Sequence, residues 1–587
     1  MSGEGERISH RYCHQKWWWD VCDKSSTPHS AFSRDDIRFQ YASHHLEILR
    51  RCSSQDISSA VKALPKTLDE TYDQMLSEIK EDKRNHAHRI FQWLAVSSRR
   101  LCVEELADVF AFDFDAEVSD IPKFDPSRRP LDPKNEILTT CSSLITIVNV
   151  EGKNLVQFSH LSVGEYLTST RIAKSVHGPH FHILPKSAHT LLAKVCLAFL
   201  LQLDHSTYVA KIQNFPLIWY AVEHWLDHAR FEDVSSDLRD MMDCLFDGAK
   251  EHWDVWNWLY DVESGRGRRR YHPSSRLAPP EAAPLYYATL CGFRDLASRL
   301  IGLQDVNTRG GYYKTPLHAA LVKELPGFAL FLLGRGADIN SRGRDSQTAL
   351  YKASSRGYTD VVRSLVDRGA EIDAEGDDWN EKGDDVKRTP LLVASKNGRL
   401  EIVRLLLERH ADVDYQDNDG KSALHLASRH HSSDVARLLL DRGANINASS
   451  TRGKTALHEA SEFGQIAAVE LLLERGVNVN VQTKSGRTPL HYAAKRGRLG
   501  VSHLLLNRRA TVNVQDKEDL LTPLHLAAAS GHPEVVKLLL RRRADPRNRT
   551  VDGETPFELA SKENHMEVMQ LLSEHSGERM EDSETRM

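Results

Sequence analysis

The chain lacks the sequence motifs on which most catalytic and metal-binding sites are built. Its 587 residues include only eight cysteines, and none of them form a Cys-x-x-Cys pair. We therefore expect neither a zinc site nor a dense disulfide framework. No Gly-x-Ser-x-Gly elbow occurs, which excludes the nucleophile turn of a serine hydrolase. We expect a protein without enzymatic activity, without a cofactor and without a metal.

The phosphate-binding loop of nucleotide-hydrolysing enzymes, Gly-x-x-x-x-Gly-Lys-Ser/Thr, is also missing. Two fragments come close, Gly420-Lys421-Ser422 and Gly453-Lys454-Thr455. The first glycine that the motif requires is replaced by Tyr415 in one and by Ala448 in the other. Neither fragment follows a predicted strand, so we do not expect either to bind nucleotide.

Long hydrophobic runs and a strong charge of one sign are absent as well. The most apolar long segment, 191–203, is too short to span a bilayer and contains Lys194. The net charge is only −5, and the polar first residues do not form a secretion signal. We expect a cytoplasmic protein, with the nucleus as an alternative, that contacts neither membrane nor nucleic acid.

What the chain has instead is a repeat. The hexapeptide Thr315-Pro316-Leu317-His318-Ala319-Ala320 returns, with small changes, at 488–493 and 522–527. Nine strong or weak copies start at 283, 315, 348, 389, 422, 455, 488, 522 and 555. Threonine or serine is a good helix N-cap, and proline fits the first helical turn. One such unit cannot bury its apolar face alone, so the copies are expected to stack as an elongated solenoid.

Two further positions of the repeat have structural explanations. The residue nine positions after the start is expected to have positive φ between two helices. It is Gly292, Gly357, Gly398, Gly464, Gly497 or Gly531 in six copies, His431 or Asn564 in two, and Glu324 in the copy that departs. The fourth hexapeptide position is histidine in five copies, namely His318, His425, His458, His491 and His525. We expect these histidines to hydrogen-bond neighbouring repeats rather than to catalyse a reaction.

The hexapeptide and its period resemble the ankyrin repeat, over 279–575. The resemblance implies a turn and two helices per copy, and binding of a protein partner through turn fingertips and the concave face of the first helices. The fifth, eighth and ninth positions of each copy are then expected to be exposed in the groove. The candidate partner-binding residues are Arg356, Trp379, Lys396, Tyr415, Arg429, His430, Phe463, Tyr492, Lys495 and Arg496.

Cations and aromatic residues are frequent at these groove positions, so one hypothesis is that the groove binds an acidic, partly extended protein segment. The alternative is that the positions are simply solvated, and the sequence leaves both open. The spacing of 41 residues between the copies at 348 and 389 contains an insertion, Glu375–Val386, with acidic residues around Trp379. Insertions in solenoids map to loops on one face, often the binding face.

The region before the repeats changes its pattern several times. The fold class predicted for the whole chain is mostly α, with a helical and winged-helix N-terminal region followed by the ankyrin solenoid. Strands are expected at Leu144–Val148 and Asn154–Phe158, and a helix at Leu101–Phe110. Tryptophans in 219–258 are expected to form a core. The predicted divisions are 1–34 irregular, 35–80 helical, 81–175 winged helix, 176–262 helical extension, 263–278 basic linker, and 576–587 disordered tail.

A second resemblance rests on motifs in this region. Segments 64–72, 141–144, 158–163 and 165–167 are similar to the winged-helix domain of GPI inositol-deacylase-like type that follows the NACHT ATPase in fungal NACHT–ankyrin proteins. The resemblance implies either a non-enzymatic scaffold or the sensing half of a STAND-type signalling NTPase, as in fungal innate immunity or heterokaryon incompatibility. Because the ATPase motif is missing, the chain would be a truncated gene product, or a partner would supply the ATPase.

Overall fold

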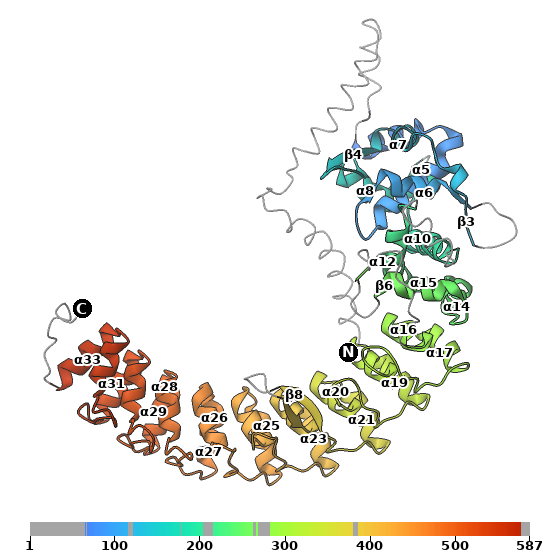
Figure 1. The fold of residues 1–587 in the computed structure, drawn as a ribbon. Helices are drawn as coiled ribbons and strands as arrows, with labels where there is room; N and C mark the ends of the chain where they lie inside the picture. Colours follow the sequence, from blue (N-terminus) through green and yellow to red (C-terminus); the bar gives the residue numbers. More distant parts are fainter. Residues whose placement is uncertain are drawn as a thin grey trace, which may run out of the picture. The chain divides into compact units, whose positions relative to one another are not determined.

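The computed structural model describes residues 65, 67–114, 121–175, 178–202, 215–261, 266–267, 282–379 and 385–576. The chain divides into two compact units (Figure 1), one of Met1–Asp113 and Phe124–Leu191, the other of Phe114–Lys123 and Leu192–Met587. The predicted segment 1–34, and most of 35–80, 263–278 and 576–587, lie outside the described residues.

The first unit combines short helices with a small antiparallel sheet. Its elements are α4 (Leu68–Ser77), η1 (Glu81–Lys83), α5 (Arg84–Val96), β1 (Leu101–Cys102), α6 (Val103–Phe110), β2 (Phe112–Asp113), β3 (Lys123–Phe124), η2 (Pro126–Arg128), α7 (Pro133–Cys141), η3 (Ser142–Leu144), β4 (Ile145–Val150), β5 (Lys153–Phe158), α8 (Leu161–Thr168), η4 (Ile172–Lys174) and α9 (Gly178–Phe181); α10 (Pro185–Leu200) runs on into the second unit. The sheet has the strand order β1-β5-β4, and three helices before a hairpin make a winged-helix arrangement.

The hairpin of the winged helix is longer than predicted. Strands β4 and β5 pair from Ile145↔Phe158 to Val150↔Lys153, so only two residues remain in the turn. Those residues, Glu151 and Gly152, have φ of 51° and 81°. Positive φ at both central positions is typical of the two-residue turn whose twist matches that of the flanking strands. The strands therefore remain paired up to the residues on either side of the turn.

The predicted helix Leu101–Phe110 starts two residues late, at Val103. Leu101 and Cys102 pair instead with Val156 and Leu155 of β5. The backbone N–H of Cys102 donates to Oε2 of Glu105 over 2.9 Å, which caps the helix. The extended conformation of Cys102 (φ −84°, ψ 164°) therefore ends the strand and precedes the helix.

Helix α4, placed in the segment 35–80 by the sequence prediction, packs on the winged helix. The hydroxyl of Tyr72 lies 2.6 Å from that of Ser162, and the hydroxyl of Tyr166 donates to Asp73 over 2.7 Å. Phe91 in turn contacts Phe158 and Phe181, with ring centroids 6.1 Å apart in both pairs. The core of this unit thus joins residues of α4, α5, β5, α8 and α9.

The second unit begins with a helical extension that covers the first repeat. Its elements after α10 are α12 (Ile218–Ala229), α13 (Val234–Asp237), α14 (Arg239–Leu245), α15 (Glu251–Leu259), β6 (Tyr260–Asp261) and β7 (Arg266–Gly267). Trp225 stacks on Phe293, with centroids 5.7 Å apart, and Trp253 meets Tyr287 at 5.4 Å. Trp225 and Trp253 are buried, as predicted for a core. The extension therefore acts as the N-terminal cap that a solenoid requires.

Nine helix pairs follow within residues 282–576, and successive pairs stack side by side in a curved row (Figure 1). They are α16 (Pro284–Cys291) with α17 (Arg294–Ile301), α18 (Pro316–Val322) with α19 (Pro326–Gly334), α20 (Ala349–Arg356) with α21 (Thr359–Asp367), α22 (Pro390–Lys396) with α23 (Leu400–Glu408), α24 (Ala423–Arg429) with α25 (Ser433–Asp441), α26 (Ala456–Phe463) with α27 (Ile466–Glu474), α28 (Pro489–Lys495) with α29 (Leu499–Asn507), α30 (Pro523–Ala529) with α31 (Pro533–Arg541), and α32 (Pro556–Lys562) with α33 (Met566–Ser576). The first helices lie on the inner side of the row and the second helices on the outer side.

The local signals of the repeat have the conformations expected from the sequence. Every residue nine positions after a repeat start has positive φ, including Glu324 at 61°, His431 at 56° and Asn564 at 57°. The five hexapeptide histidines bridge repeats as predicted. In His458, for example, Nδ1 accepts from the backbone N–H of Thr455 over 3.1 Å, and Nε2 donates to the carbonyl of Arg487 over 3.1 Å. Each such histidine joins the start of its own helix to the next repeat.

Candidate protein-binding groove and fingertip insertion

The insertion after the third repeat forms a β-hairpin. Strands β8 (Gly376–Trp379) and β9 (Asp385–Arg388) pair antiparallel, with Trp379 opposite Asp385. The backbone N–H of Asp377 also donates to the carbonyl of Asp345 in the preceding finger over 3.1 Å. The hairpin is thus continuous with the fingers on both sides of it.

A buried ion network holds the hairpin to the groove. Arg388 Nη1 donates to Oδ2 of Asp378 over 2.6 Å, and its Nε donates to Oδ2 of Asp417 over 3.2 Å. The Arg388 and Asp417 side chains are 3% and 0% exposed. Lys396, a predicted groove residue, donates to the same Asp378 oxygen over 3.1 Å. The charges are therefore balanced within the protein, which is what burial of an ion requires.

The sequence analysis missed this network, although a periodic signal for it exists. Arg487 and Asp516 form the same contact, with Nε 2.8 Å from Oδ2. Both pairs are separated by 29 residues, and in both the arginine directly precedes the threonine that caps the first helix. An arginine at that position with an aspartate 29 residues later would have identified both pairs.

Arg429 and Phe463, predicted independently, lie against each other in the groove. The Arg429 guanidinium sits 3.8 Å from the centroid of the Phe463 ring. Its Nη1 also lies 3.4 Å from Oε2 of Glu459, whose side chain is 2% exposed. Burial lowers the pKa of Arg429, against the raising effect of Glu459. This cation is held in one position by a ring on one side and a buried carboxylate on the other.

A second cluster follows one repeat further along. Lys454 Nζ lies 4.4 Å from the centroid of the Tyr492 ring and forms a short ion pair with Glu462. Arg496 Nη2 lies 3.1 Å from the other oxygen of Glu462. These contacts with the two cations keep the pKa of Glu462 below its ordinary value even though burial opposes the shift. Phe463 and Tyr492 are thus each accompanied by a cation that a glutamate already neutralises.

The remaining groove candidates differ in their surroundings. Arg356 pairs with Glu324 over 2.7 Å at the surface. Burial, aided by the positive charges of Arg429 and Lys396, lowers the pKa of His430 to about 4. Lys495 is exposed, and its ammonium has no partner among the described residues. The structure therefore does not gather these three residues into one site.

The fingertip candidate Tyr415 contacts the base of the hairpin. Its hydroxyl donates to Oε1 of Glu375 over 2.6 Å. Burial and this carboxylate raise the pKa of Tyr415 to about 12. Trp379 lies at the end of β8, opposite Asp385 in the hairpin register. Both residues thus belong to the insertion and the finger that follows it.

One expectation about the groove was wrong. The fifth hexapeptide position is not generally exposed, because Val393, Leu426 and Glu459 are 3%, 2% and 1% exposed. First helices of successive repeats pack directly on one another, so in these three repeats the fifth position faces the neighbouring helix, whereas Tyr492 at the same position is only half-buried. The eighth and ninth positions, such as Lys396 and Arg496, retain the contact with solvent.

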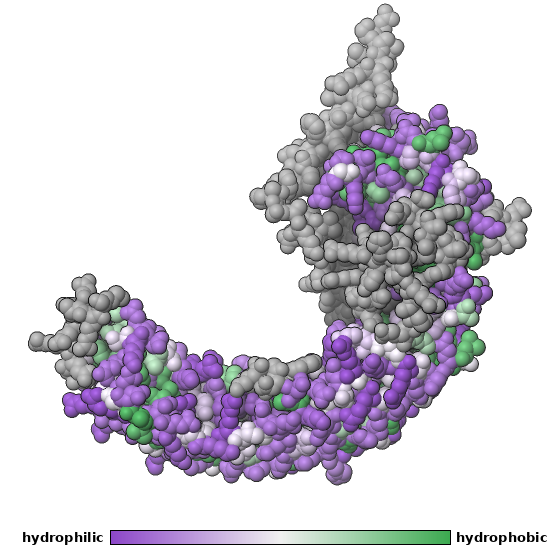
Figure 2. Space-filling model, in the orientation of Figure 1, coloured by the Kyte–Doolittle hydropathy of each residue, from purple (hydrophilic) through white to green (hydrophobic). Residues whose placement is uncertain are grey.

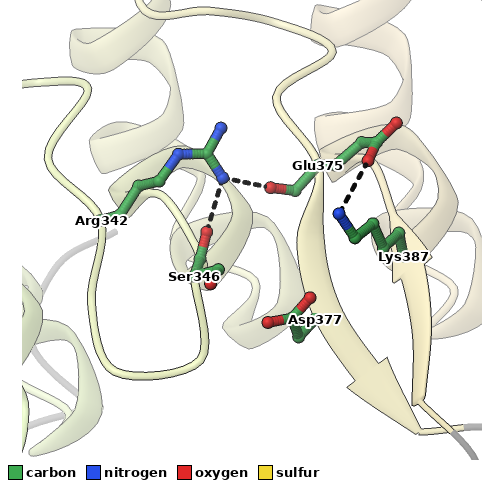
Figure 3. A pocket seen from close by; sticks show the side chains of 5 residues that line it. All are labelled: Arg342, Ser346, Glu375, Asp377 and Lys387. Atoms are coloured by element: carbon green, nitrogen blue, oxygen red, sulfur yellow. Dashed lines mark hydrogen bonds and ion pairs between the residues drawn. The ribbon is translucent and has the colours of Figure 1, made fainter.

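A polar hollow of about 510 Å³ lies beside the insertion. It is lined by Arg342, Ser346, Glu375, Asp377 and Lys387 (Figure 3). Arg342 Nη1 donates to the carbonyls of Ser346 and Glu375 over 2.8 and 2.6 Å. These bonds tie neighbouring fingers together and use the strongest donor in the hollow. Within the described residues, no three His, Cys, Asp or Glu side chains are placed to hold a metal ion.

The visible face of the second unit is mostly hydrophilic, and hydrophobic residues appear there only in small separate areas (Figure 2). Large exposed apolar patches usually mark obligate interfaces or membrane contacts. Helices long and apolar enough to cross a bilayer do not occur in the described part of the chain. On this face the aromatic and charged clusters described above are therefore the candidate binding features.

Comparison with known families agrees with both folds. The family described as "Ankyrin repeats (3 copies)" matches residues 285–376, 374–450 and 445–516, and "Ankyrin repeats (many copies)" matches 505–560. The family "GPI inositol-deacylase, winged helix domain" matches residues 72–176. The second unit thus contains ankyrin repeats, a class of protein-interaction module. The first contains a winged-helix domain of the type that the resemblance implied.

One curated relative is a fungal protein, "Azaphilone pigments biosynthesis cluster protein L" of Monascus ruber. It is 32% identical to this chain over 292 residues, which is 47% of this chain and 60% of the relative. The chain thus spans about 60% of the length of that relative.

Proposed function

We propose that this chain is a non-enzymatic scaffold or sensor that binds a protein partner in the groove of its ankyrin repeats. One observation carries the proposal, namely the two ring–cation pairs Arg429–Phe463 and Lys454–Tyr492. They stand on successive repeats, and intramolecular contacts hold each in place before any partner arrives. Aromatic and arginine side chains are the residues that most often dominate interface energies, and preorganisation reduces the entropy lost on binding.

The charge state of the groove limits which partner it selects. Arg429 faces Glu459, and Lys454 and Arg496 face Glu462. An acidic partner would have to compete with these carboxylates for the same cations, so groove recognition is expected to rest mainly on ring contacts. We place the scaffold in the cytoplasm, which a fluorescent fusion would test.

The test of groove binding is quantitative affinity purification with the full chain. Phe463→Ala and Tyr492→Ala together are expected to reduce recovery of the partner about tenfold, as for loss of interface hot spots. Arg363→Ala is a control, because this exposed residue lies on the outer helix α21. Equal recovery of the same proteins by all variants would reject groove binding. Turnover of a substrate by the chain alone would reject a purely non-enzymatic role.

A second candidate function is the sensing half of a signalling NTPase. It is favoured by the order of the two matches, with the winged-helix domain before the ankyrin repeats, as in the fungal NACHT–ankyrin proteins that the sequence resembles. In that case a partner with a phosphate-binding loop should co-purify, and its nucleotide hydrolysis should change when the chain is added. A partner set without any nucleotide-binding protein would count against this function.

A further inference from the structure

The second helices of the repeats end in arginine at one shared position. The C-cap residues are Arg335, Arg368, Arg409, Arg442, Arg475, Arg508 and Arg542. In the central repeats this arginine reaches back to an acid of the preceding repeat. Arg409 pairs with Asp367 at 2.6 Å, and Arg475 pairs with Asp441 at 2.7 Å. We call this series the arginine ladder.

The last two members of the ladder lack the acid that directly precedes the arginine in the central members. The first member reads Gly-Arg-Gly at 334–336, and the next four read Asp-Arg-Gly at 367–369, Glu-Arg-His at 408–410, Asp-Arg-Gly at 441–443 and Glu-Arg-Gly at 474–476. The same positions then become Asn-Arg-Arg at 507–509 and Arg-Arg-Arg at 541–543. The position before the arginine, which supplies an acid to the next repeat in the central members, is thus an amide at Asn507 and a cation at Arg541.

The structure shows what this change does to the contacts. Arg542 donates from Nη2 to Oδ1 of Asn507 over 2.8 Å, so it keeps the geometry of the ladder without a counter-charge. Arg508, Arg509, Arg541 and Arg543 are exposed, and their guanidinium groups form no ion pair with any described residue. Helices α29 and α31 are neighbours in the stack (Figure 1). The five arginines of 508–509 and 541–543 therefore form one patch, the arginine patch.

Backbone conformation shows that folding alone does not favour these arginines. Arg509 and Arg543 both have φ of 66°, at the position where Gly443 and Gly476 have φ of 87° and 84°. An L-residue in this left-handed region costs about 1–2 kcal/mol relative to glycine. A cation near a helix C-terminus regains only about 0.3–1 kcal/mol. The charge is thus present at some cost to the fold, a pattern found at functional sites.

We propose that the arginine patch binds a short acidic segment of a partner protein, at a surface separate from the groove. Guanidinium groups bind carboxylates through paired hydrogen bonds. Each exposed contact is weak, so several arginines on adjacent helix ends are needed for useful affinity. Unlike the groove cations, these arginines need not be released from an internal acid before they bind.

Two observations favour an acidic protein segment over a nucleic acid. Between residues 499 and 576 the only phenylalanine, tyrosine or tryptophan is Phe557, on the first helix α32, so the patch lacks the large rings on which bases stack in single-strand binding proteins. Exposed carboxylates of Glu518 and Asp545 lie in the same two repeats and would repel a long polyanion. A short acidic segment can avoid both carboxylates.

The ladder itself supplies a test variant that keeps the fold. Asn507→Glu, Arg509→Gly, Arg541→Glu and Arg543→Gly together recreate the sequence of the central members. The control is Arg363→Glu with Arg437→Glu, which removes a comparable positive charge from exposed residues in the middle of α21 and α25. The probe is a fluorescent decaglutamate peptide, titrated into the full-length protein at low salt, with thermal melts to verify folding.

The ladder-restoring variant should bind decaglutamate about tenfold more weakly than the unmodified chain, with a melting temperature at or above that of the unmodified chain. The control and the groove variant Phe463→Ala/Tyr492→Ala should bind it normally. Equal affinity of all proteins would overturn the proposal. So would loss of binding in the groove variant, or tighter binding of a single-stranded oligonucleotide than of decaglutamate. Failure of groove binding to any partner would leave this result unchanged.

Discussion

Arg388 and Asp417 form an ion pair with both side chains almost fully buried, Nε lying 3.2 Å from Oδ2. The oxygens of Asp417 also accept backbone N–H groups of Asp419 and Lys421 over 3.1 and 2.9 Å. The pair connects the insertion hairpin, through β9, to the finger of the next repeat. Arg388 is thus the buried cation that links the hairpin to the next finger.

Replacement of Arg388 by alanine should destabilise this part of the solenoid by about 3–5 kcal/mol, because it leaves buried carboxylates without their cation. Urea unfolding of the full chain, with hydrogen exchange to locate the loss, measures the effect. Lys387→Ala is the matched control. The Lys387 side chain is 57% exposed, and its Nζ lies 3.9 Å from Oε2 of Glu375. The free energy of unfolding should therefore change by less than about 1 kcal/mol. Similar losses in both variants would contradict the role given to Arg388.

The hexapeptide histidines should make the solenoid acid-sensitive. Burial lowers the pKa of His318, His458 and His491 from 6.5 to about 4. Below pH 6.5 the unfolded chain binds protons that the folded chain does not, so the free energy of unfolding falls until the pH reaches about 4. At pH 5.5 the loss is about 1 kcal/mol per histidine.

The last repeat is an internal control for this pH effect. Glu558 occupies the histidine position there, and the backbone N–H of Thr555 donates to it over 2.6 Å. This bond lowers the pKa of Glu558, so its contribution to stability persists until the pH approaches the ordinary glutamate range. Hydrogen exchange at pH 7 and 5.5, corrected for intrinsic rates, should show α26 and α28 losing protection. A pH-independent profile in these helices would contradict the prediction.

Substitution of two glycines by alanine should distinguish the free-energy cost of positive φ from the cost of a steric clash. Gly453 and Gly476 have φ of 75° and 84°, but a Cβ on Gly453 would lie 2.7 Å from the backbone nitrogen of Lys484, whereas none lies near Gly476. Gly476→Ala should therefore cost about 1 kcal/mol, the conformational term alone. Gly453→Ala should cost at least about twice as much, measured by urea unfolding. Equal costs would mean that neighbouring fingers shift freely.

The aromatic cap of the first repeat should be essential for the solenoid to remain folded at that end. Trp225 is buried against Phe293 and Trp256. Its replacement by alanine should cost about 3–5 kcal/mol. Because repeat stability depends on nearest neighbours, hydrogen exchange should increase first in α16 and α17 and leave α30 unchanged. Leu303→Ala, at a position that is 83% exposed, should leave exchange unaltered.

The repeat could be predicted from the sequence because its signals are local. The cap at Thr455, the histidine at 458 and the glycine at 464 each act within one helix pair, and the same solution recurs in the next copy. The burial of Glu459 could not be predicted in this way, because it depends on Arg429 from the preceding repeat. Strand β1 was missed because two residues carry no periodicity, and they pair with Leu155 and Val156, far along the chain.

The described part of the insertion between the copies at 348 and 389 forms a hairpin in the finger, while α22 still packs on α20 and α24 like any other first helix. The length of the finger can therefore change without a change in how the first helices pack on one another. A hairpin at this fingertip therefore changes the surface that the solenoid presents at this edge while the stacking of the first helices is kept.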